Sequence, residues 1–277
     1  MLRERLISKS PEAPHEFRWR SREVSRLEGL SDTVFGFAIT LLIVSLEVPR
    51  TSGELLQAMR GFIAFALTFA VLYALWYRQF VFFRRYGLED KQVVLLNGAL
   101  LLFVLFFVFP FKFLANVMVN RALGLGKMVQ LADGRTVAAV QSTDWPALFA
   151  VYGLGFAAIF LVFAALFHHA YSKREELGLN PLEVHDTRDS IRIFLINASL
   201  GVIVGLNGLL LTSARNAHME DLASYIFGAA EILGVIALIR FRARRRSRRA
   251  AVIRALAPPS SDAASVAHME TIPANAN

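Results

Sequence analysis

The chain has 277 residues, of which 55% are hydrophobic and 19% charged, with no cysteine and a formal net charge of +8. Soluble domains usually contain about 45–50% apolar residues, whereas the 23 phenylalanines here gather in long apolar runs such as residues 103–109. Strands of membrane barrels alternate polar and apolar residues, and these runs do not. The composition therefore predicts an all-α integral membrane protein, and the lack of cysteine excludes disulfides, thiolate metal sites and a cysteine nucleophile.

Arginines gather near both ends of the chain, in residues 18–22 and 240–249. A basic chain can indicate nucleic-acid binding, but no binding domain accompanies these arginines. Basic residues that flank apolar spans are typical of the cytoplasmic side of a membrane and favour anionic lipid. We therefore predict the lipid bilayer, and no nucleic acid, as the partner of these segments.

Six apolar segments are long enough to cross a hydrocarbon core of roughly 30 Å as helices. They are residues 30–48, 61–83, 93–114, 145–171, 191–213 and 222–241. Pro110 is expected to kink the third. The predicted organisation is a basic segment over residues 1–29, a six-helix transmembrane domain over 30–242, and a basic and then disordered tail over 243–277.

The flanks of these spans predict their orientation. Lysines and arginines number 22 on the side that holds both termini and 7 on the other side. This bias places both termini in the cytoplasm, with the chain in the plasma membrane. No cleavable signal peptide is expected, because the first 29 residues are charged and lack an apolar core. The longest loop, residues 115–144, is then external, and we expect a small hairpin or helix in it.

The most specific motif begins the first span, where residues 26–32 read Arg-Leu-Glu-Gly-Leu-Ser-Asp. One interpretation is an ordinary helix N-cap, in which Ser31 or Asp32 satisfies free N–H groups at the positive end of the dipole. The other is an ion pair of Arg26 with Asp32 that clamps the first helix to its neighbours.

Two neighbouring spans offer partners for this motif. Trp76 lies late in the second span and Asn97 early in the third, so alternating direction places both at about the depth of Asp32. A polar cluster of these residues with Arg26 and Ser31 is therefore expected. The alternatives are that Trp76 is only an interfacial anchor and that Asn97 only makes an interhelical hydrogen bond.

The motif resembles a family signature. Arg-x-x-x-Leu-Ser-Asp leading into Ala-Ile-Thr-Leu-Leu is similar to the Arg-x-x-x-Phe-Ser-Asp signature of the transmembrane protein 175 family of potassium channels. The resemblance covers roughly residues 20–115, including Trp76 and Asn97, and the later spans match in number and hydropathy. Leu30 departs from the usual Phe, and residues 78–79 (Arg-Gln) stand where the family often has a His-containing segment.

The resemblance implies a fold and a function. Prokaryotic members of the family have one six-helix repeat, assemble as homotetramers, and surround the pore with their first helices, whose apolar side chains form a hydrophobic constriction. The sequence itself contains no Thr-Val-Gly-Tyr-Gly loop, the carbonyl filter of other potassium channels. The implied function is a passive potassium-selective channel that needs no cofactor and catalyses no reaction.

Candidate pore residues follow from helical spacing in the first span. Phe37, Leu41 and Val44 share one stripe, and Thr40 lies beside it with a hydroxyl that could meet a partly hydrated cation. For an arbitrary membrane helix, such a stripe is ordinary packing, and the resemblance alone assigns it to the pore. Phe37 replaces the family's branched aliphatic residue, so its ring either narrows the pore or swings aside and leaves selectivity weak.

Other polar residues within the predicted spans are candidates for other functions: a transporter, a metal site or an enzyme. Glu231 lies midway along the sixth span, where an acid is a functional candidate by default, although a structural hydrogen bond at a helix interface would also explain it. A proton-coupled secondary transporter using Glu231 is the second hypothesis, but inverted repeats and mid-membrane helix breaks are not evident. His168 and His169 point about 100° apart on a helix and make a poor metal pair, and the spans hold too few facing polar residues for an enzyme.

Overall fold

The computed structural model describes most of the chain. The described residues are 17–21, 23–44, 50–122, 124, 128–130, 136–138 and 140–213, with 247, 249, 251 and 253. The sixth predicted span at 222–241, with Glu231, lies outside them, as does most of the predicted tail.

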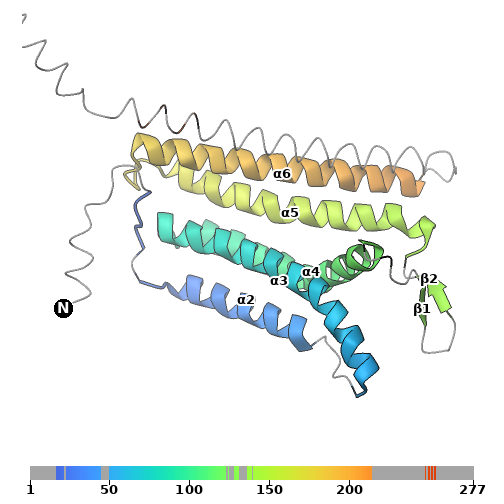
Figure 1. Ribbon diagram of the computed structural model, residues 1–277. Helices are drawn as coiled ribbons and strands as arrows, with labels where there is room; N and C mark the ends of the chain where they lie inside the picture. Colours follow the sequence, from blue (N-terminus) through green and yellow to red (C-terminus); the bar gives the residue numbers. More distant parts are fainter. Residues whose placement is uncertain are drawn as a thin grey trace, which may run out of the picture.

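Five long helices make up the described part of the chain (Figure 1). They are α2 (Arg26–Val44), α3 (Ser52–Tyr86), α4 (Lys91–Ala122), α5 (Trp145–Ser172) and α6 (Pro181–Ser213). Helix α2 packs on α3 and α4, α4 packs in turn on α5, and α5 runs beside α6. The largest buried cluster is apolar and draws on all five helices, with Phe35, Phe82 and Phe163 among its fully buried side chains.

Each of the five helices has a segment long and apolar enough to cross a membrane. In none of them is even half of that segment buried within the chain. Large apolar side chains such as Leu95, Leu102 and Leu210 remain mostly exposed. Soluble proteins rarely expose so much contiguous apolar surface to water. These faces therefore meet lipid or other protein, as expected of an integral membrane protein.

The helices extend beyond most of the predicted spans. Helix α4 continues eight residues past its predicted end at 114, and α6 starts ten residues before its predicted start at 191. The reason at α6 is a reciprocal cap: the Glu183 N–H donates to the Asn180 side chain at 2.8 Å, and the Asn180 N–H donates to Glu183 Oε2 at 3.0 Å. Such a capping box starts a helix in polar sequence, where a search for apolar runs does not see it.

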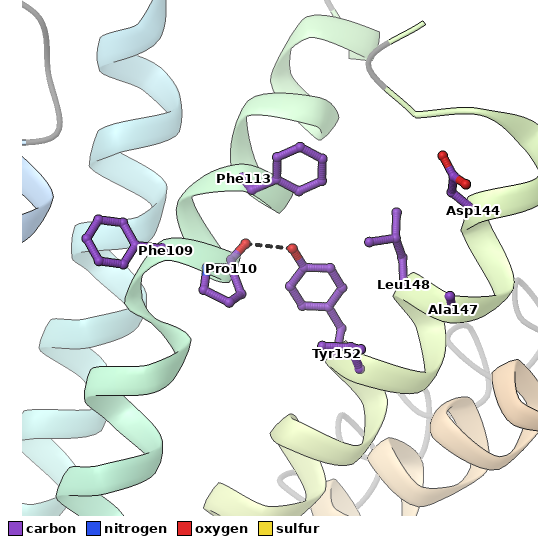
Figure 2. A pocket seen from close by; sticks show the side chains of 8 residues that line it. Phe109, Pro110, Phe113, Asp144, Ala147, Leu148 and Tyr152 are labelled. Carbon is purple, nitrogen blue, oxygen red and sulfur yellow. Dashed lines mark hydrogen bonds between the residues drawn. The ribbon is translucent and has the colours of Figure 1, made fainter.

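Pro110 lies inside α4, and the helix bends there (Figure 2). Proline lacks the N–H that would bond to the preceding turn, so the predicted kink is present. Between α4 and α5 the loop forms a small antiparallel hairpin of β1 (Met128–Gln130) and β2 (Thr136–Ala138), one of the two forms expected there. A short 3₁₀ turn, η1 (Ser142–Asp144), then leads into α5.

Candidate functional site

Helix α2 starts one and a half turns before the Ser-Asp pair. Ser25 caps it, because its Oγ accepts the Glu28 N–H at 3.1 Å and its carbonyl accepts the Gly29 N–H at 2.9 Å. Ser31 and Asp32 therefore lie in the second turn, where the backbone N–H groups already bond within the helix. The N-cap interpretation of these two residues is wrong, and their side chains are available for other helices.

A buried chain of polar side chains joins α2, α3 and α4. Gln79 donates from its amide to Asn97 Oδ1, Asn97 donates to Ser31 Oγ at 2.9 Å, and Ser31 donates to the Leu27 carbonyl at 2.8 Å. Gln79, Asn97 and Ser31, whose side chains form these bonds, are each at most 1% exposed. Buried polar groups cost free energy unless they are paired, so this chain fixes one mutual arrangement of the three helices.

A second contact joins α2 to α3 nearer the surface. The Trp76 indole N–H donates to Asp32 Oδ1 at 2.7 Å. The indole also packs between Tyr73 and Phe80, with ring centroids 5.3 and 5.6 Å away, within an aromatic stack along α3. The stack limits the movement of Trp76, so its N–H holds Asp32 in a defined position.

Arg26 does not join this cluster. Its side chain is exposed, and within the described residues it has no hydrogen bond or ion pair, so the expected clamp with Asp32 is absent from the single chain. The adjacent turn supplies a different pair: Glu28, 2% exposed, lies 3.3 Å from Arg84 Nε at the end of α3. Helical geometry explains this, because Glu28 shares the buried face with Ser31 while Arg26 points away from it.

Two members of the site were missed by the sequence analysis. Gln79 follows Trp76 by three residues, and Glu28 precedes Ser31 by three, so each shares a helix face with a predicted member. That spacing is the signal that would have found them. In the sequence, Gln79 stands out only as a departure from the family pattern, as does Arg78, whose guanidinium lies 5.8 Å from the centre of the Phe194 ring.

The candidate pore residues lie on the opposite side of α2. Phe37 is 57% exposed and Val44 73%, and Thr40 is also exposed, while Leu41 is half-buried at the edge of the stripe. Phe35, Ala38 and Leu42 bury the other side. Leu30 continues the exposed stripe at its start. The helix thus offers a largely apolar face, which also carries the exposed hydroxyls of Thr33 and Thr40, to whatever lies beyond its own chain.

The segment before α2, residues 17–21, is attached firmly to the rest of the protein. Arg20 lies 2.7 Å from Glu183 Oε2 at the start of α6, and Arg18 lies 3.4 Å from the same oxygen. The backbone N–H of Arg20 also donates to the Arg84 carbonyl at 3.0 Å. The Glu183 side chain is fully buried. We call this segment the strap, because it ties the entry of α2 to both α3 and α6.

A further polar junction joins α4 to α5 at the same end of the bundle. Asp90 caps α4 through the Val93 N–H at 3.1 Å, and it lies 2.7 Å from His169 Nε2 and 3.1 Å from Lys173 Nζ. Burial alone would raise the pKa of Asp90, but the bonds from His169, Val93 and Lys173 outweigh it and hold that pKa well below its usual range. Asp90 raises the pKa of Lys173 in turn. Within the described residues, no three His, Asp or Glu side chains are placed to hold a metal ion.

Comparison with known protein families finds a match to one family. The family described as "Endosomal/lysosomal potassium channel TMEM175" matches residues 26–108, a range that includes α2, α3 and the first half of α4. The match therefore spans the helices that carry the buried polar chain and the exposed stripe.

Three proteins show the extent of the similarity. A potassium channel of Marivirga tractuosa is 37% identical over 187 residues, which are 68% of this chain and 75% of that protein. A potassium channel of Chamaesiphon minutus is 30% identical over 131 residues, 44% of this chain and 64% of that protein. A crystal structure of a variant of the potassium channel MtTMEM175, in complex with a nanobody–MBP fusion protein, superposes with a TM-score of 0.69 at 33% identity, over 84% of this chain and 97% of that one.

Proposed function

Because this chain belongs to the TMEM175 family of potassium channels, as a prokaryotic member, we propose that it conducts potassium ions passively across a membrane. The observation that carries the proposal is the exposed stripe of α2. A helix that is apolar enough to cross the membrane turns Phe37, Thr40 and Val44 away from its own chain. Such a face lines a path when copies of the helix surround an axis.

The proposed assembly is a homotetramer in which four α2 helices line the pore. Each would contribute one side chain to rings at Phe37, Thr40 and Val44. Leu41, half-buried beside the stripe, would support these rings from behind and complete the constriction. Arg26 and Leu30, exposed in the single chain, are then free to meet neighbouring copies at the mouth.

The polar contacts behind α2 set which face it turns to the pore. The helix repeats every 3.6 residues, so a rotation of α2 by about 100° would replace each pore residue with its sequence neighbour. The chain from Gln79 through Asn97 to Ser31, with the bond from Trp76 to Asp32, opposes such a rotation. Their proposed role is therefore structural, and the Asp32 carboxylate additionally attracts cations to the mouth.

Permeation through apolar rings requires a cation to lose part of its hydration. Potassium loses water at a lower cost than sodium, which favours potassium at the constriction. The Thr40 hydroxyl, which donates to the Gly36 carbonyl at 2.9 Å, keeps acceptor capacity for a partly dehydrated ion. A small tilt of α2 would widen the rings, admit water and open the path. The large Phe37 ring is compatible with either strong or weak selectivity for potassium over sodium.

In this proposal the partners are potassium, the lipid bilayer and other copies of the chain, and no cofactor or enzymatic step is required. The chain would lie in the cell membrane with the strap end in the cytoplasm, as the lysine and arginine bias predicts. The alternative of a proton-coupled transporter relies on Glu231, which lies outside the described residues. The relatives, which are named potassium channels, do not favour it.

Ion flux into liposomes tests the function. Purified protein would be assayed with potassium, sodium and N-methyl-D-glucamine, for wild type and Phe37→Ala. We expect wild type to prefer potassium. The variant should pass the large cation about tenfold faster, because a barrier lowered by about 1.4 kcal/mol raises a rate tenfold.

A matched control is Phe62→Ala on α3, since Phe62 is 56% exposed and Phe37 57%. The control should leave selectivity unchanged if Phe37 lines the pore. Absence of passive flux of every cation, with uptake driven by a proton gradient instead, would contradict the channel and favour the transporter.

A further inference from the structure

A crevice separates the bent part of α4 from the start of α5 (Figure 2). Its volume is about 480 Å³, and it is open along one side. Pro110, where α4 bends, lies in the lining of this space. The Tyr152 hydroxyl donates to the Pro110 carbonyl at 2.7 Å and bridges the two helices.

The walls of the crevice are apolar. Phe113 of α4 and Leu148 of α5 face the space between the helices (Figure 2), and Val151 extends the same wall. Phe113 is 43% exposed and Val151 49%, so the described part of the chain leaves this surface uncovered. The Tyr152 hydroxyl is already bonded to Pro110. Among the described residues that line the crevice, only Asp144 is charged, and it lies at the end where α5 begins.

The position of the crevice along the spans places it at the edge of the bilayer. Pro110 lies 19 residues after Lys91, the first residue of the α4 span, which is about 28 Å along a helix rising 1.5 Å per residue. The hydrocarbon core is roughly 30 Å thick. Asp144 directly precedes the span that begins at Trp145. Leu148 and Val151, one to two turns inside that span, are therefore at the depth of acyl chains, and Asp144 is at the depth of headgroups.

We propose that this crevice binds one phospholipid with an ammonium headgroup, such as phosphatidylethanolamine. An acyl chain would lie between α4 and α5 against Phe113, Leu148 and Val151. The ammonium would lie against the Asp144 carboxylate, which repels anionic headgroups. Gln141 orients that carboxylate, because its N–H donates to Asp144 Oδ2 at 3.0 Å. The proposal holds whether or not the protein conducts potassium.

The charge at the mouth can be tested without changing the crevice walls. Full-length protein would be reconstituted in nanodiscs of equimolar phosphatidylethanolamine and phosphatidylglycerol, and the lipids retained per chain counted by native mass spectrometry. Wild type should retain the ethanolamine lipid preferentially. Asp144→Asn should lower that preference about two- to fivefold, as expected for one exposed charge pair, and Asp144→Lys should reverse it.

The walls are tested by filling the crevice with Ala147→Phe. Retention of both lipids should fall, by about fourfold in affinity for each methylene group displaced. Leu161→Phe is the control, because Leu161 is 47% exposed on α5 and does not line the crevice. Equal retention of the two lipids by wild type, or unchanged retention in Ala147→Phe, would overturn the proposal. A loss of oligomer mass in Ala147→Phe, with the amount of retained lipid unchanged, would also overturn the proposal. It would show that another copy of the chain, and not a lipid, occupies the crevice.

Discussion

Helix α2 and the α5–α6 pair are held in opposite ways. Between α5 and α6 the backbones themselves are in contact: a Cβ at Gly153 would lie 2.3 Å from the Gly205 nitrogen, and one at Gly208 would lie 2.4 Å from the Ala150 nitrogen. The two glycines of α2 make no such contact, since nothing lies within 4 Å of a Cβ placed at Gly29 or Gly36. Helix α2 is held by one apolar face and by side-chain hydrogen bonds.

The difference separates a fixed part from an adjustable one. Close backbone packing through small residues is a stable form of helix association in membranes, and it leaves α5 and α6 little freedom to move relative to each other. Side-chain hydrogen bonds can lengthen or exchange during a small tilt. A pore helix that widens its rings needs that second kind of attachment, and the strap ties it to the rigid pair through Arg20 and Glu183.

The largest effect is expected from Gly153→Ala. Its new Cβ would meet the Gly205 nitrogen and the Gly201 carbonyl oxygen at 2.7 Å or less, and these backbone atoms cannot rotate away. We expect a loss of about 3 kcal/mol or more in the free energy of unfolding, at the upper end for overpacking. Thermal unfolding followed by circular dichroism in detergent would measure it.

The control for this substitution is Gly98→Ala on α4, where nothing lies within 4 Å of the new Cβ. Since alanine is the better helix former by about 1 kcal/mol, this variant should be as stable as wild type or more so. Equal destabilisation by the two substitutions would show that backbone contact is not what holds α5 to α6.

A smaller effect is expected from Asn97→Ala, which breaks the attachment of α2. Gln79 and Ser31 each lose a partner in a buried site. Unsatisfied groups cost about 1–3 kcal/mol in proteins, and hydrogen bonds within membranes average less, so we expect a loss of about 1–2 kcal/mol. Potassium selectivity in the liposome assay should also weaken, because α2 becomes free to rotate.

Asn197→Ala provides the comparison, because among the described residues Asn197 donates only within its own helix, to the Ile193 carbonyl at 2.7 Å. It should leave selectivity unchanged. If both asparagine variants altered selectivity equally, the buried chain would have no special part in positioning α2.

The smallest effect concerns Asp90, at the junction between the α2–α4 group and the α5–α6 pair. Its pKa is lowered in the folded protein, so its contribution to stability is present above the ordinary value of about 3.9 and is lost as the pH falls below it. We expect the difference in unfolding midpoint between wild type and Asp90→Asn to narrow as the pH falls below about 4. Since asparagine caps a helix about as well as aspartate, a difference that did not change with pH would show that the effect does not come from the ionised carboxylate.

Some of the site was predictable because local rules decide it. Ser31, Asp32, Trp76 and Asn97 were placed at one depth from the alternating direction of the spans, and hydrogen bonds join them in two groups in the folded chain. The kink at Pro110 follows from the chemistry of proline. The start of α2 was misplaced because Ser25, not the Ser-Asp pair, supplies the cap, and both are acceptable capping residues by sequence alone.

The sequence by itself determined that the chain is a helical membrane protein, where its apolar spans lie, and which residues share a face of each helix. Helical periodicity and hydropathy are properties of neighbouring residues, so no tertiary information is needed for them. Only the tertiary structure decided that α2 turns Glu28 and Ser31 inward and Phe37 and Val44 outward. That choice depends on Gln79, Asn97 and Arg84, which lie dozens of residues away and reach α2 only when α3 and α4 fold against it.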